Sequence, residues 1–251
     1  MSKYKPMWKL EQKADAPNTL TMYIYGDVEG DGYDWWTCEV IESETSANYF
    51  RKELSKYPNV TEIEIYINSC GGSVFEGTAI YNQLRRHSAH KTVYIDGFAC
   101  SIASVIAMAG DTVVMPKNAL MMVHHASMCC YGNAAELRKA AEDLDQINTG
   151  NRQAYLQKAG EKLDESKLIE LLDNESYLTA AECIEYGLAD EYAEKDADMQ
   201  DMKQLLDKQD LSLEQRLKVR QSMVTQLNIL VKEARKEPEQ KKNLLHLFEK
   251  I

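Results

Sequence analysis

A serine, a histidine and two acidic residues in this sequence could together activate a nucleophile. Ser101 lies in the stretch GFACSIASVIAMAG (97–110), where it follows a turn and opens an apolar run that is typical of a buried helix. A serine becomes nucleophilic when a base takes its proton, a third group orients that base and donors hold the oxyanion. His124, at the end of the apolar stretch ALMMV, is the candidate base, and Asp173 and Glu175 are the candidate acids.

Two further features bear on this chemistry. The Gly71-Gly72 pair follows an apolar strand pattern, and glycine lets a backbone amide approach a ligand closely. Cys100 competes with its neighbour Ser101 as nucleophile, but consecutive residues at a helix start point in different directions, so only one of them can meet His124. Each feature alone is common as a helix cap, a strand-end histidine or a tight turn, and only their order and spacing together indicate catalysis.

The elements that must position these residues alternate between strands and helices. In residues 61–69 (TEIEIYINS), the isoleucines fall on one face with the period of two that is typical of a strand. Further strands are expected over 21–28, 91–95, 111–116 and 119–126, and helices over 46–58, after Gly72, after Ser101, over 133–158 and over 179–187. Such strand–turn–helix units predict an α/β domain with functional groups on the turns that leave the strands.

Composition and charge exclude several classes of protein. The chain is 44% hydrophobic and 27% charged, and no apolar run approaches the roughly 18 residues that cross a membrane. The last 57 residues hold twelve Lys/Arg and ten Asp/Glu, so the first 194 hold seventeen basic and thirty acidic residues. An acidic body disfavours nucleic-acid binding. The first residues lack the apolar core of a secretory signal, so the expected location is the cytoplasm.

The six cysteines form no zinc-ligand pattern, so we expect reduced thiols, no metal and no cofactor. Three segments are expected: an N-terminal segment over 1–19, the α/β domain over 20–194 and a helical C-terminal extension over 195–251. The extension carries one apolar helical stripe up to Pro238. It is interpreted as an appendage packed on the body or a neighbouring subunit, with a partner-binding helix as the alternative.

Five motifs in order resemble those of the ClpP peptidases, the self-compartmentalising serine proteases, over about residues 20–192. They are YINSCGGSVFEG, GFACSIAS, MMVHHA, GNAAEL and YLTAAECIEYGLAD. The resemblance implies the ClpP/crotonase-like fold, a repeated β-β-α spiral with a long handle helix. It also implies a cofactor-free endopeptidase that binds an extended peptide as an added strand beside the glycine turn.

The resemblance implies roles for particular residues. Ser101 fills the nucleophile position, and His124 matches the histidine, because it directly follows MMV. The acid aligns with Glu175, where the family more often has aspartate, and Asp173 is the alternative. The implied oxyanion hole consists of the backbone amides of Gly72 and Ile102, with Gly71 as the near alternative.

The resemblance also implies assembly into a homo-oligomeric ring, with two rings stacked through the helix over 133–158. The apolar stripe of that helix, Leu137 to Ile147, suits burial against a partner, while packing on its own subunit is the alternative. Cys70 replaces the usual proline, and the C-terminal extension has no counterpart in housekeeping members. Because of these departures, it stays open whether the protein docks to an ATP-driven unfoldase. Divergent ClpP-like proteins with such features resemble phage or prophage proteases of capsid maturation.

Two other functions remain as alternatives. Crotonase-like acyl-CoA enzymes share the superfamily fold, but they need carboxylates in the pocket, so Ser101 and His124 disfavour them. A catalytically silent scaffold or assembly subunit is disfavoured by the complete Ser–His–acid set, because a silent chain has no chemical need for it.

Overall fold

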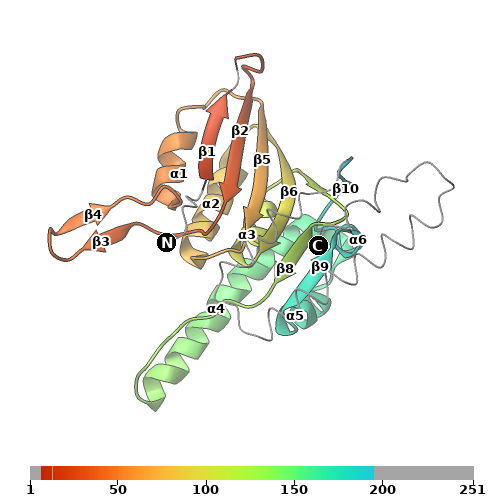
Figure 1. Ribbon diagram of the computed structural model, residues 1–251. Helices are drawn as coiled ribbons and strands as arrows, with labels where there is room; N and C mark the ends of the chain where they lie inside the picture. Colours follow the sequence, from red (N-terminus) through yellow and green to blue (C-terminus); the bar gives the residue numbers. More distant parts are fainter. Residues whose placement is uncertain (1–6, 13, 195–251) are drawn as a thin grey trace, which may run out of the picture. The chain divides into compact units, whose positions relative to one another are not determined.

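The strand with alternating isoleucines, β5 (Glu62–Ser69), lies near the middle of a mostly parallel sheet (Figure 1). The computed structural model describes residues 7–12 and 14–194, all within one compact unit of the chain. The expected C-terminal extension, which includes the second unit Asp210–Ile251, lies outside the described residues. So does the start of the expected N-terminal segment, residues 1–6.

The sheet joins strands from both ends of the described chain. Its other strands are β1 (Met7–Gln12), β2 (Thr19–Tyr25), β6 (His90–Cys100), β7 (Thr112–Met115), β8 (Leu120–Val123), β9 (Ser176–Thr179) and β10 (Glu191–Tyr192). Within the described residues they pair in the order β1-β2-β5-β6-β7-β10, with β8 pairing β6 and β9. The pairs β1–β2 and β8–β9 are antiparallel, and the others are parallel.

Three helices pack together beside the sheet and bury its isoleucine face (Figure 1). They are α1 (Ala47–Leu54), α2 (Val74–Arg86) and α3 (Ile102–Ala107). The apolar spacing of α1 and α2 places Phe50, Ile80 and Leu84 in the core, each fully buried. Ser46 and Ser73 cap the two helices, because each side chain accepts a hydrogen bond from the third amide of its helix.

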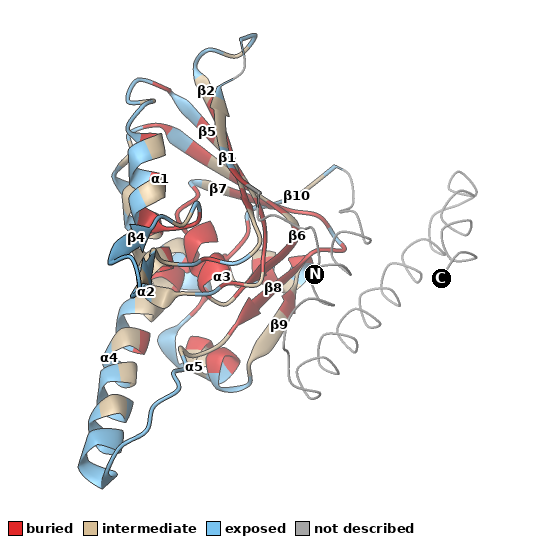
Figure 2. Cartoon of the chain, turned by 60° about the vertical axis from the view of Figure 1, so that its left-hand side comes forward, coloured by how far each residue is buried: buried red, intermediate tan, exposed pale blue. Residues whose placement is uncertain are grey.

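The remaining elements complete the fold around this core. They are the hairpin strands β3 (Gly32–Asp34) and β4 (Glu39–Ile41), the long helix α4 (Ala134–Ala159), the 3-10 turn η1 (Gly160–Lys162), and the helices α5 (Glu165–Asp173) and α6 (Ala180–Glu185). The N-terminal half of α4 extends away from the sheet and is mostly exposed (Figure 2). No described helix is long and apolar enough to span a bilayer.

The expected fold class is confirmed: a mixed α/β architecture with a mostly parallel sheet and a long helix over the expected handle segment. The turn expected over residues 97–99 is wrong. β6 continues to Cys100, because the backbone of residues 98–100 pairs with residues 120–122 of β8. This pairing carries the strand directly to the nucleophile candidate.

Candidate active site

Strand register brings the candidate residues together. Cys100 at the end of β6 pairs with Met122 of β8, so Ser101 comes beside the end of β8, which His124 directly follows. β8 and β9 are antiparallel with Val123 opposite Ser176, so one further step along that register sets His124 against Glu175. Three residues that are far apart in the sequence therefore meet at the ends of three neighbouring strands.

Ser101 has an unusual backbone conformation at the junction of β6 and α3. Its φ is 55° and its ψ is −129°, a region that non-glycine residues rarely adopt. The residue stands at the N-cap position of α3, yet its side chain caps no helix amide. The hydroxyl is therefore left for another partner, and strained strand-to-helix turns of this kind are typical of catalytic nucleophiles.

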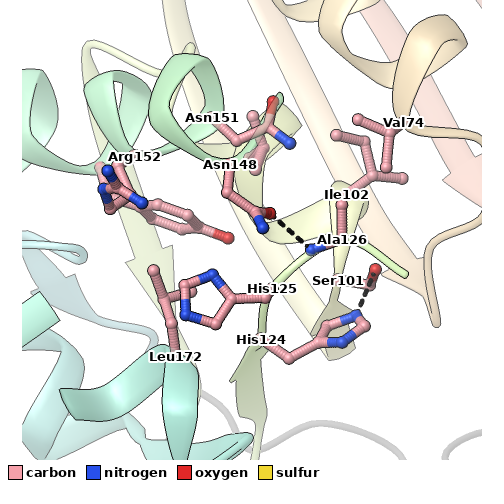
Figure 3. Close-up of a pocket in the computed structure, with 12 residues that line it drawn as sticks. Val74, Ser101, Ile102, His124, His125, Ala126, Asn148, Asn151, Arg152 and Leu172 are labelled. Atoms are coloured by element: carbon pink, nitrogen blue, oxygen red, sulfur yellow. Dashed lines mark hydrogen bonds between the residues drawn. The ribbon is translucent and has the colours of Figure 1, made fainter. Parts of the chain in front are cut away.

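That partner is His124. Nε2 of His124 lies 2.7 Å from Oγ of Ser101, a hydrogen-bond distance (Figure 3). Burial lowers the pKa of His124 below the ordinary value of 6.5, while the Glu175 carboxylate acts against this lowering. A lowered pKa keeps the imidazole neutral near neutral pH, which is the form that can accept a proton from Ser101.

The two candidate acids have different partners. Asp173 contacts His125, with 3.0 Å between its Oδ1 and the imidazole Nε2. Glu175 is half-buried and acts on the pKa of His124 through its charge, but within the described residues no hydrogen bond joins the two. Glu175 also has a positive φ of 47°. The effect of its charge on the pKa of His124 and its place in the strand register favour Glu175 over Asp173 as the acid that orients His124.

The glycine turn lies against the nucleophile. A Cβ on Gly71 (φ 102°) would fall 2.6 Å from Cβ of Ser101, so this position accepts no side chain. The amide of Gly71 donates to Oγ of Ser69 at 3.1 Å, whereas Gly72 is exposed and its amide has no backbone acceptor among the described residues. The expected donor is therefore Gly72 rather than Gly71.

Val28 and Ser69, neither of which is a candidate site residue from the sequence, fix this turn. The backbone of Val28 bridges it, accepting from the Ser73 amide at 2.7 Å and donating to the Gly71 carbonyl at 2.8 Å. Ser69 Oγ donates to the carbonyl of Gly26 at 2.5 Å. Such contacts hold the turn although Cys70 stands in place of proline. Ser69 lies within the motif YINSCGG, whereas nothing in the sequence marks Val28.

Cys100, the competing nucleophile, is buried at the end of β6. The thiol of Cys70 beside it and burial raise the pKa of the Cys100 thiol well above its ordinary value. A thiol with a raised pKa forms little thiolate and is a poor nucleophile. Burial and the raised pKa of its thiol fit Cys100 to a packing role rather than to attack on a substrate.

Helix α4 supports the site from behind. Asn148, which is buried, accepts a hydrogen bond from the Ala126 amide at 2.7 Å, and this contact fixes the loop that follows His124. Tyr155 is buried with its hydroxyl 2.6 Å from Oγ of Ser104, and Ser104 Oγ donates to the carbonyl of Ser101 at 2.5 Å. Both α4 residues support the site, and neither stands in the matched motifs.

A pocket opens beside Ser101 and His124 (Figure 3). One part of its wall is apolar and comes from α2, α3 and α5, and the other is polar and comes from α4. An open pocket next to a serine–histidine pair can hold a substrate side chain while the hydroxyl attacks the neighbouring carbonyl. The arrangement can therefore perform acyl transfer.

Comparisons with known proteins point to one family. The sequence matches the Clp protease family over residues 44–196, more than half of the chain. It is 31% identical over 133 residues to an ATP-dependent Clp protease proteolytic subunit from Deinococcus radiodurans, which is 52% of this chain and 64% of that protein. A protein of the same description from Chlorella vulgaris is 33% identical over 132 residues, 51% of this chain and 64% of the relative. The matches thus span less than two thirds of these relatives.

Proposed function

The chain belongs to the Clp protease family, and we propose that it is a serine endopeptidase with Ser101 as nucleophile, His124 as base and Glu175 as the orienting acid. Ser101 Oγ attacks the peptide carbonyl while His124 Nε2 takes its proton. His124 then gives that proton to the leaving amine, and water releases the acyl group by the same route in reverse. The observation that carries this proposal is the 2.7 Å contact between Ser101 and His124.

The oxyanion of the tetrahedral intermediate is held by the backbone amides of Gly72 and Ile102. The open amide of Gly72 and the start of α3 at Ile102 support this assignment. Preorganised amides of this kind need no reorganisation during the reaction, and the loss of one donor typically slows catalysis by about 100-fold or more. A substrate peptide that binds in an extended conformation beside the exposed Gly72 forms main-chain hydrogen bonds with the enzyme. These bonds do not depend on the substrate's side chains, so selectivity for particular substrate residues would come from side-chain pockets.

The proposal includes a homo-oligomeric ring that encloses the site. Leu137 of the α4 stripe is 42% exposed on the isolated chain, and Ala140, Leu144 and Ile147 are only partly buried. An apolar helix face of this kind is suited to contact with a second copy of the chain. The relatives from both organisms are described as subunits, which supports assembly. Cytoplasmic location and a role in phage or prophage capsid maturation stay predictions.

Labelling with a serine-directed fluorophosphonate tests the proposal. The full-length protein, Ser101→Ala and Cys100→Ala are incubated with the reagent, and the adduct is located by intact mass and peptide mapping. We expect one adduct on Ser101 that is absent from Ser101→Ala and retained in Cys100→Ala. Casein cleavage should fall by at least about 1,000-fold in Ser101→Ala.

Two outcomes would contradict the proposal. An adduct on Cys100 would make the thiol the nucleophile. The absence of any adduct in every oligomeric state would favour the scaffold alternative, in which the same fold serves assembly without catalysis.

A further inference from the structure

The pocket beside the nucleophile is the place for one particular substrate side chain. Ser101, Ile102 and His124 all line it, so it lies next to the carbonyl that Ser101 would attack (Figure 3). The side chain of the residue that supplies this carbonyl, the P1 residue, must therefore enter it. This inference rests on the proposed peptidase function and concerns which P1 residue the pocket accepts.

The pocket has two chemically different walls. Its apolar lining residues, here called the apolar wall, can pack against the methylene groups of a substrate side chain; they are Val74, Ile102, Val105 and Leu172. Its polar wall comes from one face of α4 and carries Asn148, Asn151 and Arg152. The two asparagines and the arginine make this wall rich in polar groups beside an apolar surface.

The hydrogen bonds that the polar wall makes within the protein determine whether it presents donors or acceptors to a substrate side chain. Oδ1 of Asn148 accepts from the Ala126 amide at 2.7 Å, and Oδ1 of Asn151 accepts from the Thr78 hydroxyl at 3.2 Å. An amide side chain has one oxygen that accepts and one nitrogen that donates two hydrogens. With both oxygens engaged, the asparagines present their nitrogens, which are donors.

Arg152 adds further donors to the same wall. Its Nε donates to Glu165 Oε1 at 3.2 Å and its Nη2 donates to Thr149 Oγ1 at 3.1 Å, and these contacts hold the guanidinium in place. The side chain is only 16% exposed. Because a guanidinium has five N–H groups and no acceptor, it still has hydrogens to donate beyond these two bonds.

The other polar groups in the pocket do not offset these donors. The Tyr155 hydroxyl contacts Ser104 at 2.6 Å, and His125 Nε2 contacts Asp173 at 3.0 Å. His125 Nδ1 makes no hydrogen bond among the described residues, but it is buried and so presents no acceptor to the open space of the pocket. The pocket is therefore a site of apolar packing with excess donors.

We propose that this pocket selects a P1 side chain with an apolar stem and a terminal oxygen acceptor, namely glutamine or glutamate. The stem packs against the apolar wall, and the terminal oxygen accepts hydrogen bonds from the wall of α4. A leucine or methionine in the same place would cover the donors without satisfying them, and unpaired buried donors are costly. A lysine would bring a further cation and three more donors to a wall that already has an excess.

Synthetic peptides that differ only at P1 test this selection. The full-length protein is given peptides with glutamine, glutamate, asparagine, leucine or lysine at P1, and kcat/KM is measured for each by mass spectrometry of the products. We expect glutamine and glutamate to exceed leucine and lysine by at least about tenfold, since a site built to pair a polar group rejects analogues that lack it. Asparagine should lie between, because its shorter stem reaches the wall less well.

Variants of the α4 wall locate the selectivity. Asn151→Leu should reduce cleavage after glutamine by about tenfold and increase cleavage after leucine. Arg152→Leu should reduce cleavage after glutamate more than after glutamine, because only glutamate carries a charge for the guanidinium. Arg138→Leu is the matched control: Arg138 is an exposed arginine of the same helix that does not line the pocket, so the P1 preference should stay unchanged.

The rate of fluorophosphonate labelling at Ser101 distinguishes a failure of the P1 selectivity from a failure of the peptidase function, because the reagent reacts with Ser101 without a P1 side chain. Normal labelling with a preference for leucine or lysine would overturn the inference and leave the peptidase function standing. Normal labelling in Asn151→Leu and Arg152→Leu with an unchanged P1 preference would also overturn it. No labelling and no cleavage of any peptide would overturn both.

Discussion

Two features of Ser101, its strained backbone and its contact with His124, fit a nucleophile better than a packing residue. A serine in a sparsely populated backbone region costs about 1–3 kcal/mol, and the position is held by the pairing of β6 with β8. The hydroxyl caps no helix and instead contacts a half-buried histidine. A packing residue at this position would need neither the strained backbone nor the contact with His124.

The pH dependence of Ser101 acylation depends on the charge near His124. Because burial lowers the pKa of His124, the acid limb of the labelling rate should have its midpoint below 6.5. The Glu175 carboxylate raises that pKa, so Glu175→Gln should shift the limb to still lower pH and slow labelling on the plateau. The measurement is the fluorophosphonate labelling rate as a function of pH.

Asp173→Asn is the matched control for this experiment. Asp173 contacts His125, so its loss should leave the position of the acid limb unchanged. If Asp173→Asn moved the limb and Glu175→Gln did not, Asp173 would be the third member of the triad. An acid limb above 6.5 would contradict the effect of burial on His124.

At the scale of elements, the site is built by strand ends and by one turn that allows their close approach. β5, β6 and β8 end side by side, and the glycine turn after β5 lies in contact with Ser101 at the end of β6. The absence of a Cβ at Gly71 is what permits this contact, because a Cβ there would overlap with Ser101 and the Cys100 carbonyl.

Gly71→Ala should therefore damage the site. The new Cβ would lie 2.6 Å from Ser101 Cβ and 2.8 Å from the Cys100 carbonyl oxygen, at a φ of 102° that alanine rarely adopts. We expect destabilisation of about 1–3 kcal/mol and at least a tenfold loss of labelling rate at Ser101. Urea unfolding and labelling measure the two effects.

Gly150→Ala in α4 is the matched control. A Cβ there would meet nothing within 4 Å, and alanine favours the helix over glycine by about 0.5–1 kcal/mol. The urea midpoint should rise slightly with an unchanged labelling rate. A Gly71→Ala protein that labelled as fast as the unmodified chain would show that the turn can move away from Ser101.

Sequence patterns predict the central elements well and the peripheral ones poorly. The isoleucine period of β5 and the capping box of α6, formed by Thr179 and Glu182, are local signals, and both are present in the structure. The hairpin β3–β4 and the strand β9 are absent from the prediction, because strands of three or four residues are too short to carry a clear apolar period. The extension of β6 to Cys100 depends on pairing with β8, which is not local.

The candidate site shows the same division. Residue types and the order of motifs identify Ser101, His124 and Gly72, because their chemistry is visible in the sequence. Asn148 and Tyr155 are missed, because they act only through the packing of α4 behind the site. The choice between Glu175 and Asp173 depends on side-chain direction, which two positions so close in sequence do not reveal.

At the scale of the whole molecule, α4 has two halves with different surroundings. Its C-terminal half packs against the body through Ala154, Tyr155 and Ala159, all buried. Its N-terminal half is mostly exposed and starts at a capping box formed by Asn133 and Glu136 (Figure 2). A helix that is stabilised at one end and open along an apolar stripe at the other is suited to assembly.

Leu144→Asp tests this assembly. A charge in the α4 stripe should oppose burial against a second copy, so the sedimentation coefficient should fall to that of a smaller species. Casein cleavage should fall with it if the site needs the ring. Gln146→Asp places the same charge at an exposed position off the stripe and should leave the assembly unchanged. Rings that persist in Leu144→Asp would place the contact elsewhere.

Exposed tryptophans on the β3–β4 hairpin allow its surroundings to be followed by intrinsic fluorescence. Of the three tryptophans, Trp35 and Trp36 lie on this hairpin, 86% and 95% exposed, whereas Trp8 is buried with its ring edge-on to Phe50. Indole emission shifts to shorter wavelength when water is removed from the ring, so the red part of the fluorescence spectrum belongs to the hairpin and the blue part to the core. In a Trp8→Phe variant, all tryptophan emission would come from the hairpin. A shift of that emission to shorter wavelength would then show that a partner or a second copy covers the hairpin, without an attached dye.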